Sequence, residues 1–424
     1  MSGDPLGALA RGAADALTAV RAWSGSTASS DPEAAVAAAL LGYLSEPGDG
    51  VLGRVVGVLG ARRAATGLLA VRPGPELAEE VAARAPGGVD VPSPRELSAG
   101  LARWLPRLDA AAFARSIAQA ARVRAHLLLP DDDAWPDRVD DLGAHAPLAL
   151  WVRGRPAALS ESPSIALVGA RAATGYGEHV AIESSAGLVD RGFAVVSGGA
   201  YGIDGTAHRA ALAAGGTTVA FLAGGVDRYY PAGHETLLGR IADTGAVVSE
   251  LPCGAAPTRW RFLQRNRLIA AAAGATVVLE AGMRSGSLNT AGHAATLGRP
   301  LGAVPGAVTS PASAGCHRLL REFDAVCVTD AAQMAELVTV DGGGRDGDGT
   351  RRVGAPARQH VLDGLTSEER RVLDALGVRR RRTIDELVRS TGMGSGAVMG
   401  ALGALDATGL AARSDEGWVR RPPD

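Results

Sequence analysis

The stretch SGGAYGID at residues 197–204 decides the fold of this chain. The apolar run before it, at 193–196, predicts a buried parallel strand, and residues 204–214 behind it have the composition of a helix. A glycine-rich turn that leaves a strand and opens a helix points backbone N–H groups and the helix dipole at one place, where anions bind. An ordinary tight turn between a strand and a helix has the same pattern. The stretch therefore predicts a parallel α/β unit. By itself it does not identify a ligand, which has to be inferred from the other motifs of the chain.

Strand and helix signals alternate on both sides of this stretch, from residue 126 to residue 340. Helical segments fit between most of the apolar segments, and such alternation is typical of an α/β fold with a doubly wound parallel sheet. Ligands of such sheets bind at the carboxyl ends of the strands, where most of the unusual clusters of this sequence fall. The expected strands are 148–153, 165–169, 193–197, 217–223, 246–250, 275–280, 300–304 and 324–328.

The regions that flank the sheet have other patterns. Residues 1–31 end in small polar residues and are expected to be poorly ordered. Residues 32–125 hold Ala- and Leu-rich helical segments, broken by turns that contain Pro and Gly, and predict a helical domain. Residues 341–359 are rich in Gly and Asp and predict a flexible linker. Residues 360–424 give three helices and then two short strands, which is the order of a winged helix.

Composition narrows the classes of function. The net charge is −2, so no overall basic field attracts nucleic acid, and any such surface must be local. All 43 basic residues are arginine, which excludes lysine Schiff bases and a Walker A lysine. The three cysteines lack metal or redox spacing, as expected for reduced thiols in the cytoplasm. No apolar run reaches the roughly 18 residues of a membrane span, and the start lacks the basic region of a signal peptide.

The segment RWRFLQRNR at 259–267 combines four arginines with two aromatic residues and no acid. Guanidinium groups beside aromatic rings are typical of proteins that bind single-stranded nucleic acid, because they contact phosphates and stack on bases. The alternative is a network of ion pairs with Glu250, Glu280 and other acids.

The segment MRSGSLNT at 283–290 follows a predicted strand and repeats the pattern of a Gly/Ser turn that opens a helix. Its hydroxyl groups can cap that helix or donate to phosphate. Three such loops, near residues 170, 199 and 286, fall at one edge of the expected sheet, with the arginine segment 259–267 between them. Together they indicate an extended anionic ligand.

Residues with catalytic chemistry are sparse. His208 lies four residues after Asp204 on a predicted helix, and His293 lies on another, but neither has the spacing of a triad or a metal site. An Asp204–His208 pair is one possible acid–base arrangement, although an aspartate that caps a helix is the more common case. No GxGxxG motif occurs. We therefore expect no catalytic residue, no metal and no cofactor.

Nine motifs occur along the chain in a fixed order: VGAR (168–171), SGGAYGID (197–204), AH (207–208), YP (230–231), SE (249–250), RNRLIA (265–270), EAGMRSGSLNTA (280–291), GRP (298–300) and VPG (304–306). In this order and spacing they resemble the DNA-processing protein A (DprA/Smf) family over roughly residues 126–330. The helical domain, which is similar to SAM or helix-hairpin-helix modules, and the terminal winged helix resemble the longer members of the family.

The resemblance implies a Rossmann-like, mainly parallel sheet and a cytoplasmic, non-enzymatic protein that binds single-stranded DNA, usually as a homodimer. Family members protect incoming DNA and load the RecA recombinase on it during natural transformation. Carried over to this sequence, the DNA-binding residues are Gly169, Arg171, Ser197, Gly198, Gly199, Ala200, Tyr201, Phe262, Arg265, Asn266, Arg267, Ser285, Gly286 and Thr290.

Two positions depart from the family pattern. Leu263 stands where proline is usual, and GCHRLL at 315–320 replaces the usual Gly-x-Asn-x-Leu-Ile. The first departure concerns base stacking, and the second concerns the segment on the dimer side.

Two other functions compete with this interpretation. The first is a Rossmann-like hydrolase that releases the base from nucleoside monophosphates, but the run Pro-Gly-Gly-x-Gly-Thr of those enzymes is missing here. The second is a transcription regulator that acts through the winged helix. Its expected recognition helix, at 394–409, carries one acid and no arginine, whereas a helix that reads a groove needs cations and long polar side chains. We therefore expect this domain to pack against protein.

Overall fold

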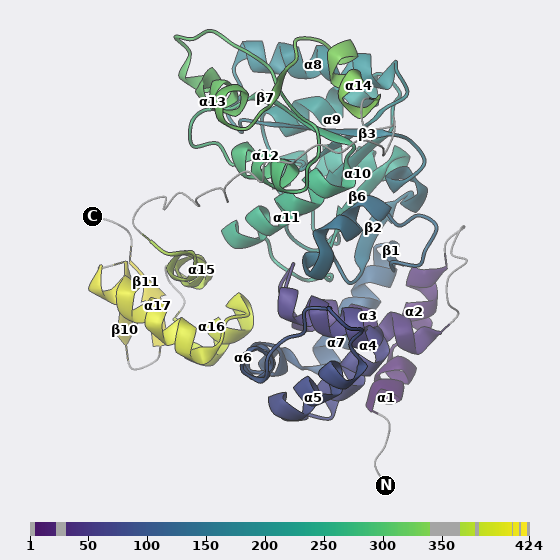
Figure 1. Ribbon diagram of the computed structural model, residues 1–424, viewed down its shortest axis with the longest axis vertical. Helices are drawn as coiled ribbons and strands as arrows, with labels where there is room; N and C mark the ends of the chain where they lie inside the picture. Colours follow the sequence, from purple (N-terminus) through teal and green to yellow (C-terminus); the bar gives the residue numbers. More distant parts are fainter. Residues whose placement is uncertain are drawn as a thin grey trace.

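The computed structural model shows a central α/β body, a helical body at the amino terminus and a small carboxyl-terminal domain (Figure 1). The expected linker at 341–359 lies outside the described residues. The residues that the structure describes are 5–22, 31–339, 365–377, 381–408, 410–414 and 417–421.

A single sheet of nine strands forms the centre of the described structure, in the order β1-β2-β6-β5-β4-β3-β7-β8-β9. All pairs from β6 through β9 are parallel, and the pairs β1–β2 and β2–β6 are antiparallel. The predicted mainly parallel sheet and its eight expected strands are confirmed, whereas β1 was not predicted. The strands are β1 (Ala125–Leu128), β2 (Leu150–Gly154), β3 (Ser164–Gly169), β4 (Ala194–Ser197), β5 (Thr218–Phe221), β6 (Ala246–Ser249), β7 (Ala275–Glu280), β8 (Leu301–Ala303) and β9 (Val326–Cys327).

The order of the strands reverses between β3 and β7. From β3 the chain proceeds outward through β4, β5 and β6, and then returns to the other side of β3 to form β7, β8 and β9. Ligands of open α/β sheets bind outside the carboxyl ends of the strands at such a switch point. The loops near residues 170, 199 and 286 follow β3, β4 and β7, which are neighbours in the sheet. The fold therefore brings the three glycine-rich loops to one place.

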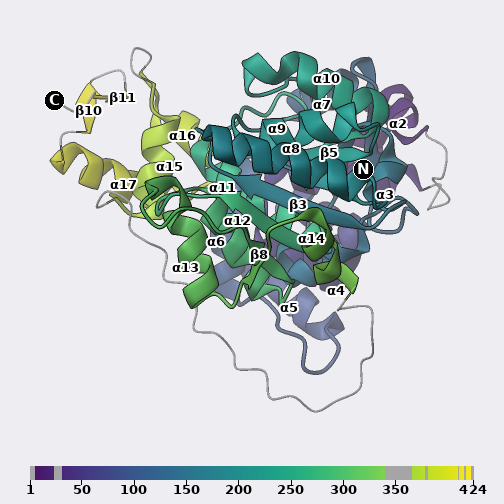
Figure 2. The same cartoon turned by 90° about the horizontal axis from the view of Figure 1, so that it is seen from above.

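Helices cover both faces of the parallel part of the sheet (Figure 2). Alternate residues of β3 point to opposite faces: Ile165 and Leu167 pack with α8, α9 and α14, whereas Ala166 and Val168 pack with α11, α12 and α13. The helices are α8 (Gly175–Val189), α9 (Ile203–Ala213), α10 (Glu235–Thr244), α11 (Arg259–Ala272), α12 (Ser287–Thr296), α13 (Ala314–Glu322) and α14 (Ala331–Thr339), with short 3₁₀ turns η2 (Asp137–His145), η3 (Pro156–Leu159), η4 (Ala232–His234) and η5 (Pro311–Ser313).

The described elements before β1 are all helical, as expected for residues 32–125. A correction applies to residues 1–31, which were expected to be poorly ordered. Residues 5–21 form two helices because Leu6, Leu17 and Val20 share apolar faces that are buried in the core. Residues 1–4 and 23–30 lie outside the described residues. The helices are α1 (Pro5–Gly12), α2 (Ala14–Arg21), α3 (Pro32–Leu44), α4 (Gly50–Leu69), α5 (Gly74–Arg84), α6 (Pro94–Trp104) and α7 (Ala110–Arg122), with the 3₁₀ turn η1 (Leu105–Arg107) after α6.

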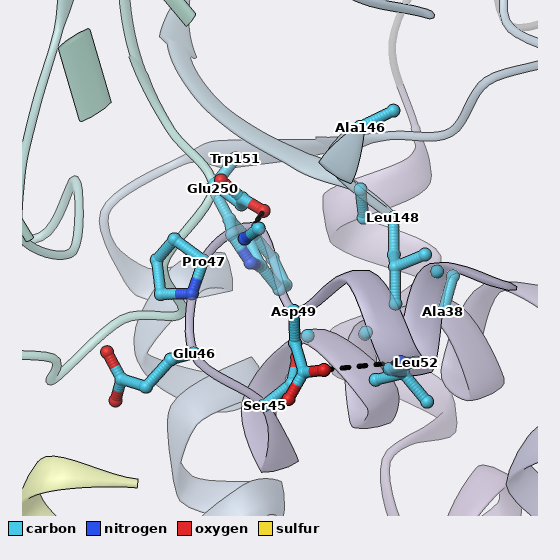
Figure 3. A pocket seen from close by; sticks show the side chains of 15 residues that line it. Ala38, Ser45, Glu46, Pro47, Asp49, Leu52, Ala146, Leu148, Trp151 and Glu250 are labelled. Atoms are coloured by element: carbon cyan, nitrogen blue, oxygen red, sulfur yellow. Dashed lines mark hydrogen bonds between the residues drawn. The ribbon is translucent and has the colours of Figure 1, made fainter. Parts of the chain in front are cut away.

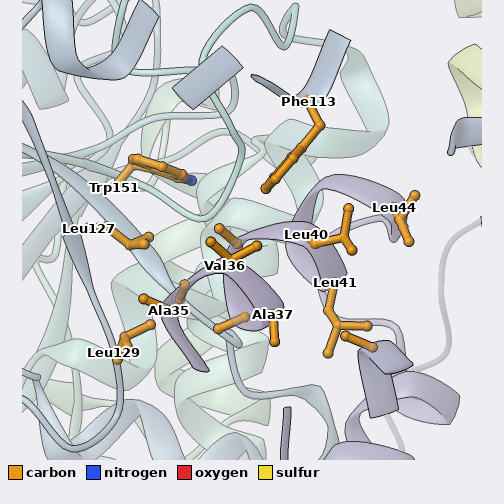
Figure 4. Close-up of a cluster of buried hydrophobic side chains, with 14 of the residues drawn as sticks. Ala35, Val36, Ala37, Leu40, Leu41, Leu44, Phe113, Leu127, Leu129 and Trp151 are labelled. Atoms are coloured by element: carbon orange, nitrogen blue, oxygen red, sulfur yellow. The ribbon is translucent and has the colours of Figure 1, made fainter. Parts of the chain in front are cut away.

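The helical body packs on the sheet at β1, β2 and β6. The turn between α3 and α4 lines a pocket together with Leu148, Trp151 and Glu250 from the sheet side (Figure 3). The α3 helix itself is apolar on every side, as buried helices are. It packs between Phe113 of α7 and Leu127 and Trp151 of the sheet (Figure 4). The two bodies therefore share one hydrophobic core.

The carboxyl-terminal domain has the predicted order of three helices and two antiparallel strands. They are α15 (Ser367–Ala375), α16 (Ile384–Thr391), α17 (Ser395–Ala407), β10 (Ala411–Ser414) and β11 (Gly417–Arg420). Thr366 and Thr383 cap the first two helices through reciprocal hydrogen bonds with Glu369 and Glu386. No helix in the described part of the chain is both long and apolar enough to cross a membrane.

Candidate nucleic-acid interface

The glycine-rich loop after β4 is held by buried polar side chains. The carboxylate of Asp204 accepts hydrogen bonds from the N–H groups of Gly198 (3.2 Å) and Ala200 (3.4 Å). Burial raises the pKa of Asp204. Ser197 is fully buried, and its Oγ donates to the carbonyl oxygen of Leu167 at 2.7 Å. Asp204 and Ser197 therefore shape the loop from within.

The loops after β3 and β4 are packed backbone against backbone. Gly202 has φ +74°, and a Cβ on it would lie 2.2 Å from the carbonyl oxygen of Ala170 and 2.4 Å from that of Arg171. The N–H of Ile203 donates to the same carbonyl of Ala170 at 3.1 Å. Only glycine satisfies both the dihedral angle and the close approach. The two loops therefore form one surface.

Arg265 fixes this surface from below. Its side chain is buried, and Nη1 donates to the carbonyl oxygen of Gly198 at 2.6 Å and also to that of Phe221. Gly198 is the first residue after β4, and Phe221 is the last residue of β5. The guanidinium of Arg265 therefore connects the ends of two neighbouring strands. Arg265 is 6% exposed and its Nη1 is engaged by these two carbonyls, which indicates a positioning role, and its direct contact with DNA stays a prediction.

Arg267 is engaged elsewhere. The residue is 4% exposed, and its Nη2 lies 2.5 Å from the carboxylate of Glu250. Glu250 also accepts from the N–H of Gly48 at 3.3 Å (Figure 3). The ion pair between Arg267 and Glu250 therefore joins α11 to the helical body. For Arg267 the alternative from the sequence, an ion pair with an acid, is correct. Glu280 has a different partner: it is 2% exposed and accepts from both the N–H and the hydroxyl of Thr174.

Asn266 connects α11 to the third loop. Its Nδ2 donates to Oδ1 of Asn289 at 3.2 Å and to the carbonyl oxygen of Gly286 at 3.5 Å. Asn266 and Thr290 are buried, whereas Ser285 is half-buried and Gly286 is exposed. The tip of this loop is therefore open to solvent, whereas the buried residues at its base hold the loop against α11.

A group of cationic and aromatic side chains, three exposed and one half-buried, lies at the same end of the sheet as these buried residues. The guanidinium carbon of Arg171 is 5.0 Å from the ring centre of Phe262, and the ring of Tyr230 is 5.7 Å from the same centre. Tyr201 packs edge-on against His234, with ring centres 4.7 Å apart. Tyr201 and Tyr230 are each 49% exposed, so their ring faces are accessible. We call Arg171, Tyr201, Tyr230 and Phe262 the aromatic shelf.

The predicted site residues thus lie at the carboxyl ends of β3 and β4, in the loop after β7, on α11 or, for Thr290, on α12. Tyr230 was not among the predicted DNA-binding residues, although the motif YP contains it, because the exposure of its ring depends on the tertiary packing. The predicted site residues differ in how exposed they are to solvent. The exposed ones are Arg171, Tyr201 and Gly286, and the half-buried ones are Gly169, Ala200, Phe262 and Ser285. The buried ones are Ser197, Gly198, Gly199, Arg265, Asn266, Arg267 and Thr290.

The two histidines considered for catalysis have different surroundings: His208 is buried, and His293 is half-buried on α12. His208 is fully buried, with Nδ1 2.7 Å from Oγ1 of Thr218, and burial lowers its pKa to about 3. Burial, together with Arg267, lowers the pKa of His293 to about 4. No group of three or more His, Cys, Asp and Glu side chains suited to a metal ion occurs among the described residues.

Comparisons with known proteins bear on this site. Residues 126–339 match the family described as DNA recombination-mediator protein A, and residues 355–417 match the DprA winged helix domain. A putative DNA processing protein DprA from Mycobacterium tuberculosis is 51% identical over 304 residues, which is 69% of this chain and 76% of that protein. The chain belongs to the DNA recombination-mediator protein A family.

More distant DprA proteins agree with this assignment. The DNA processing protein DprA of Streptococcus pneumoniae is 38% identical over 206 residues, or 49% of this chain and 72% of that protein. The X-ray structure of DprA from the same organism superposes with a TM-score of 0.55 at 28% identity, covering 70% of this chain and 95% of that one. Both the DprA-type sheet and the winged helix expected from the sequence are thus confirmed.

The segment 315–320, which departs from the family's sequence pattern, lies in α13 beside the third loop. Gly315 donates its N–H to the carbonyl oxygen of Ala281 at 2.7 Å, and a Cβ on Gly315 would lie equally close to that oxygen. Cys316 and Leu319 are buried behind it. Gly315 matches the glycine of the family pattern and lies where the backbone of α13 contacts that of Ala281. The residues that differ from the pattern at 316–320 therefore leave this backbone contact intact.

Proposed function

We propose that this protein binds single-stranded DNA across the aromatic shelf and the three loops that surround it. The observation that carries the proposal is the aromatic shelf itself, because exposed rings and a guanidinium lie beside three glycine-rich loops at the switch point of the sheet. Arg171 and the exposed Arg284, in the loops after β3 and β7, contact phosphates, while Tyr201, Tyr230 and Phe262 stack on bases. The description of the family as mediators of DNA recombination supports this function.

The chemistry of the shelf favours single strands. A ring face can stack only on a base that is free of its own neighbours, whereas the bases of a duplex are already stacked. Contacts to phosphates and ring faces carry little sequence information, so we expect binding to be indifferent to sequence.

We further propose that the bound strand is protected and then passed to the RecA recombinase, that the protein works as a cytoplasmic homodimer in DNA recombination and natural transformation, and that it carries out no chemical step. Two assays address these points. Light scattering on the purified chain should give the mass of a dimer, and the chain should accelerate assembly of RecA on single strands coated with a single-strand-binding protein.

The test of DNA binding is a titration of a labelled single strand and the matching duplex at several salt concentrations. We expect tighter binding of the single strand, with an affinity that falls as salt rises because phosphate contacts release counterions. Equal affinity for the duplex at physiological salt would refute the proposal. In a parallel assay, release of free base from nucleoside monophosphates would favour the hydrolase alternative.

A further inference from the structure

Exposed apolar side chains gather at the carboxyl ends of the parallel strands. Ten large apolar side chains are exposed in the described part of the chain, and five of them lie at this edge of the sheet. Two of the five, Tyr201 and Tyr230, belong to the aromatic shelf. The other three are Tyr176 (47% exposed), Met283 (55%) and Val308 (89%), which follow β3, β7 and β8. Apolar side chains that cluster on a surface mark binding sites, whereas scattered ones need no explanation.

Tyr176 is held at this edge by contacts with the two strands beyond β3. It lies in the first turn of α8, and its hydroxyl donates to the carbonyl oxygen of Pro305, two residues after β8, at 2.6 Å. Thr174, which caps α8, donates its N–H (2.9 Å) and its hydroxyl (2.6 Å) to the carboxylate of Glu280, the last residue of β7. The ring of Tyr176 is therefore fixed in place, and a ring that is already fixed loses little conformational freedom when a base stacks on it.

The loops after β7 and β8 pack against each other and against Tyr176. A Cβ on Gly306, in the loop after β8, would lie 3.7 Å from Cε1 of Tyr176. A Cβ on Gly282, in the loop after β7, would lie 3.4 Å from the carbonyl oxygen of Pro311. These contacts bring three exposed side chains to one surface, which we call the second platform: Tyr176, Met283 and Val308.

The second platform continues the proposed DNA site along the edge of the sheet. β4, β3, β7 and β8 are consecutive neighbours, and strands lie about 4.8 Å apart, so roughly 14 Å separates the loop after β4 from the loop after β8. The exposed Arg171 and Arg284 lie in the two loops between them. Residues 164–177 and 281–321 contain no acidic residue, and the neighbouring Glu280 is buried. A polyanionic strand that leaves the aromatic shelf therefore meets two cations and loops without acids before it reaches the second platform.

The winged-helix domain leaves this surface open. It packs against protein, as its sequence predicted, at the helical body and the first turn of α11. The guanidinium carbon of Arg371 in α15 lies 4.9 Å from the ring centre of Trp260, and Nε of Arg107 donates to the carbonyl oxygen of Arg389 at 3.0 Å. The side chains of the second platform are exposed with the domain in this position.

We propose that the single strand extends from the aromatic shelf across the loop after β7 to the second platform, where one base stacks on the ring of Tyr176 between Met283 and Val308. The inference rests on the proposed function, because the same strand occupies both surfaces. Continuity with the aromatic shelf and the lack of acids in these loops favour nucleic acid over a second copy of the chain. A tyrosine ring stacks on any base, so the added contact lengthens the site without making it sequence-specific.

The test is a titration of the full chain with labelled single strands of increasing length. The shortest strand that binds the unmodified chain occupies the aromatic shelf, and a strand several nucleotides longer reaches both surfaces. We expect Tyr176→Ala to weaken binding of the longer strand about tenfold, the loss of one stacked base, and to leave binding of the shortest strand unaffected. The matched control is Ile182→Ala, which removes another exposed apolar side chain farther along α8 and should change neither affinity.

A second variant tests the same surface if Tyr176→Ala does not fold. Val308→Asp places an acid in a loop without acids, at a side chain that is 89% exposed, and it should likewise weaken only the longer strand. Unchanged affinity of Tyr176→Ala for the longer strand would overturn the proposal, and so would an equal loss for both strands. Loss of the dimer mass in light scattering at unchanged affinity would assign the second platform to a second copy of the chain instead. The proposed function fails in a different way, because the unmodified chain would then bind neither strand.

Discussion

The burial of Arg265 makes a sharp prediction about how the loop after β4 is maintained. Arg265→Met keeps the apolar stem of the side chain and removes the guanidinium. The carbonyl oxygens of Gly198 and Phe221 then lose their donor in an environment where Arg265 is only 6% exposed. The substitution should therefore destabilise the fold and, through the displaced loop, weaken DNA binding.

The size of the effect follows from the two hydrogen bonds. Each hydrogen bond from a charged donor is worth about 1.5–3 kcal/mol, so the pair contributes about 3–6 kcal/mol. Desolvation of the buried guanidinium, which lowers its pKa to about 10, offsets part of this gain. We expect Arg265→Met to lower the free energy of unfolding by roughly 2–4 kcal/mol, since the buried carbonyls are left unpaired.

Arg171→Met is the matched comparison, because Arg171 is exposed on the aromatic shelf. We expect its free energy of unfolding to change by no more than about 0.5 kcal/mol, as for other surface substitutions. Its salt slope for single strands should fall by about 0.7, the loss of one phosphate contact.

Urea denaturation and the salt titration, applied to both variants, separate positioning from contact. Arg265→Met should change stability with little change of salt slope, and Arg171→Met should do the reverse. If Arg265→Met were as stable as the unmodified chain and lost as much salt slope as Arg171→Met, Arg265 would contact phosphate directly. The positioning role would then be wrong.

Three further predictions concern the aromatic shelf, the ion pair and the buried histidine. Tyr230→Ala should weaken single-strand binding by roughly 1–3 kcal/mol, the value of one stacked base, and unchanged affinity in the titration would remove Tyr230 from the interface. Glu250→Gln should lower the free energy of unfolding by about 3–5 kcal/mol, because it leaves the buried cation of Arg267 uncompensated; a loss below about 1 kcal/mol on urea denaturation would contradict this. The folded pKa of His208, about 3, is below its unfolded value of 6.5, so the unfolded chain binds the additional proton between these values and stability is lost as pH falls from about 6.5 toward 3. His208→Gln should remove about 1.4 kcal/mol per pH unit of that dependence, and an identical pH profile for both chains would count against a neutral buried His208.

The sequence by itself determined the fold class and the strands of the parallel sheet. Strands buried on both faces are nearly continuous apolar runs, such as Ala275–Glu280, so composition alone locates them. The glycine-rich loops were equally visible, because the residue types that a tight turn beside a strand requires are few. The strand Ala125–Leu128 was missed, since it contains His126 and is a strand only through its antiparallel pairing with Leu150–Gly154.

Only the tertiary structure decided the partners of three of the four arginines in the segment 259–267. The helical period shows which of them share a face, but it does not show which face is covered by protein. Arg265 is enclosed by two strand ends, Arg267 by Glu250, and Arg261 by Glu46, which is 215 residues away in the chain. Burial and partner choice depend on which segments pack together, and contacts across such a separation leave no local pattern in the sequence.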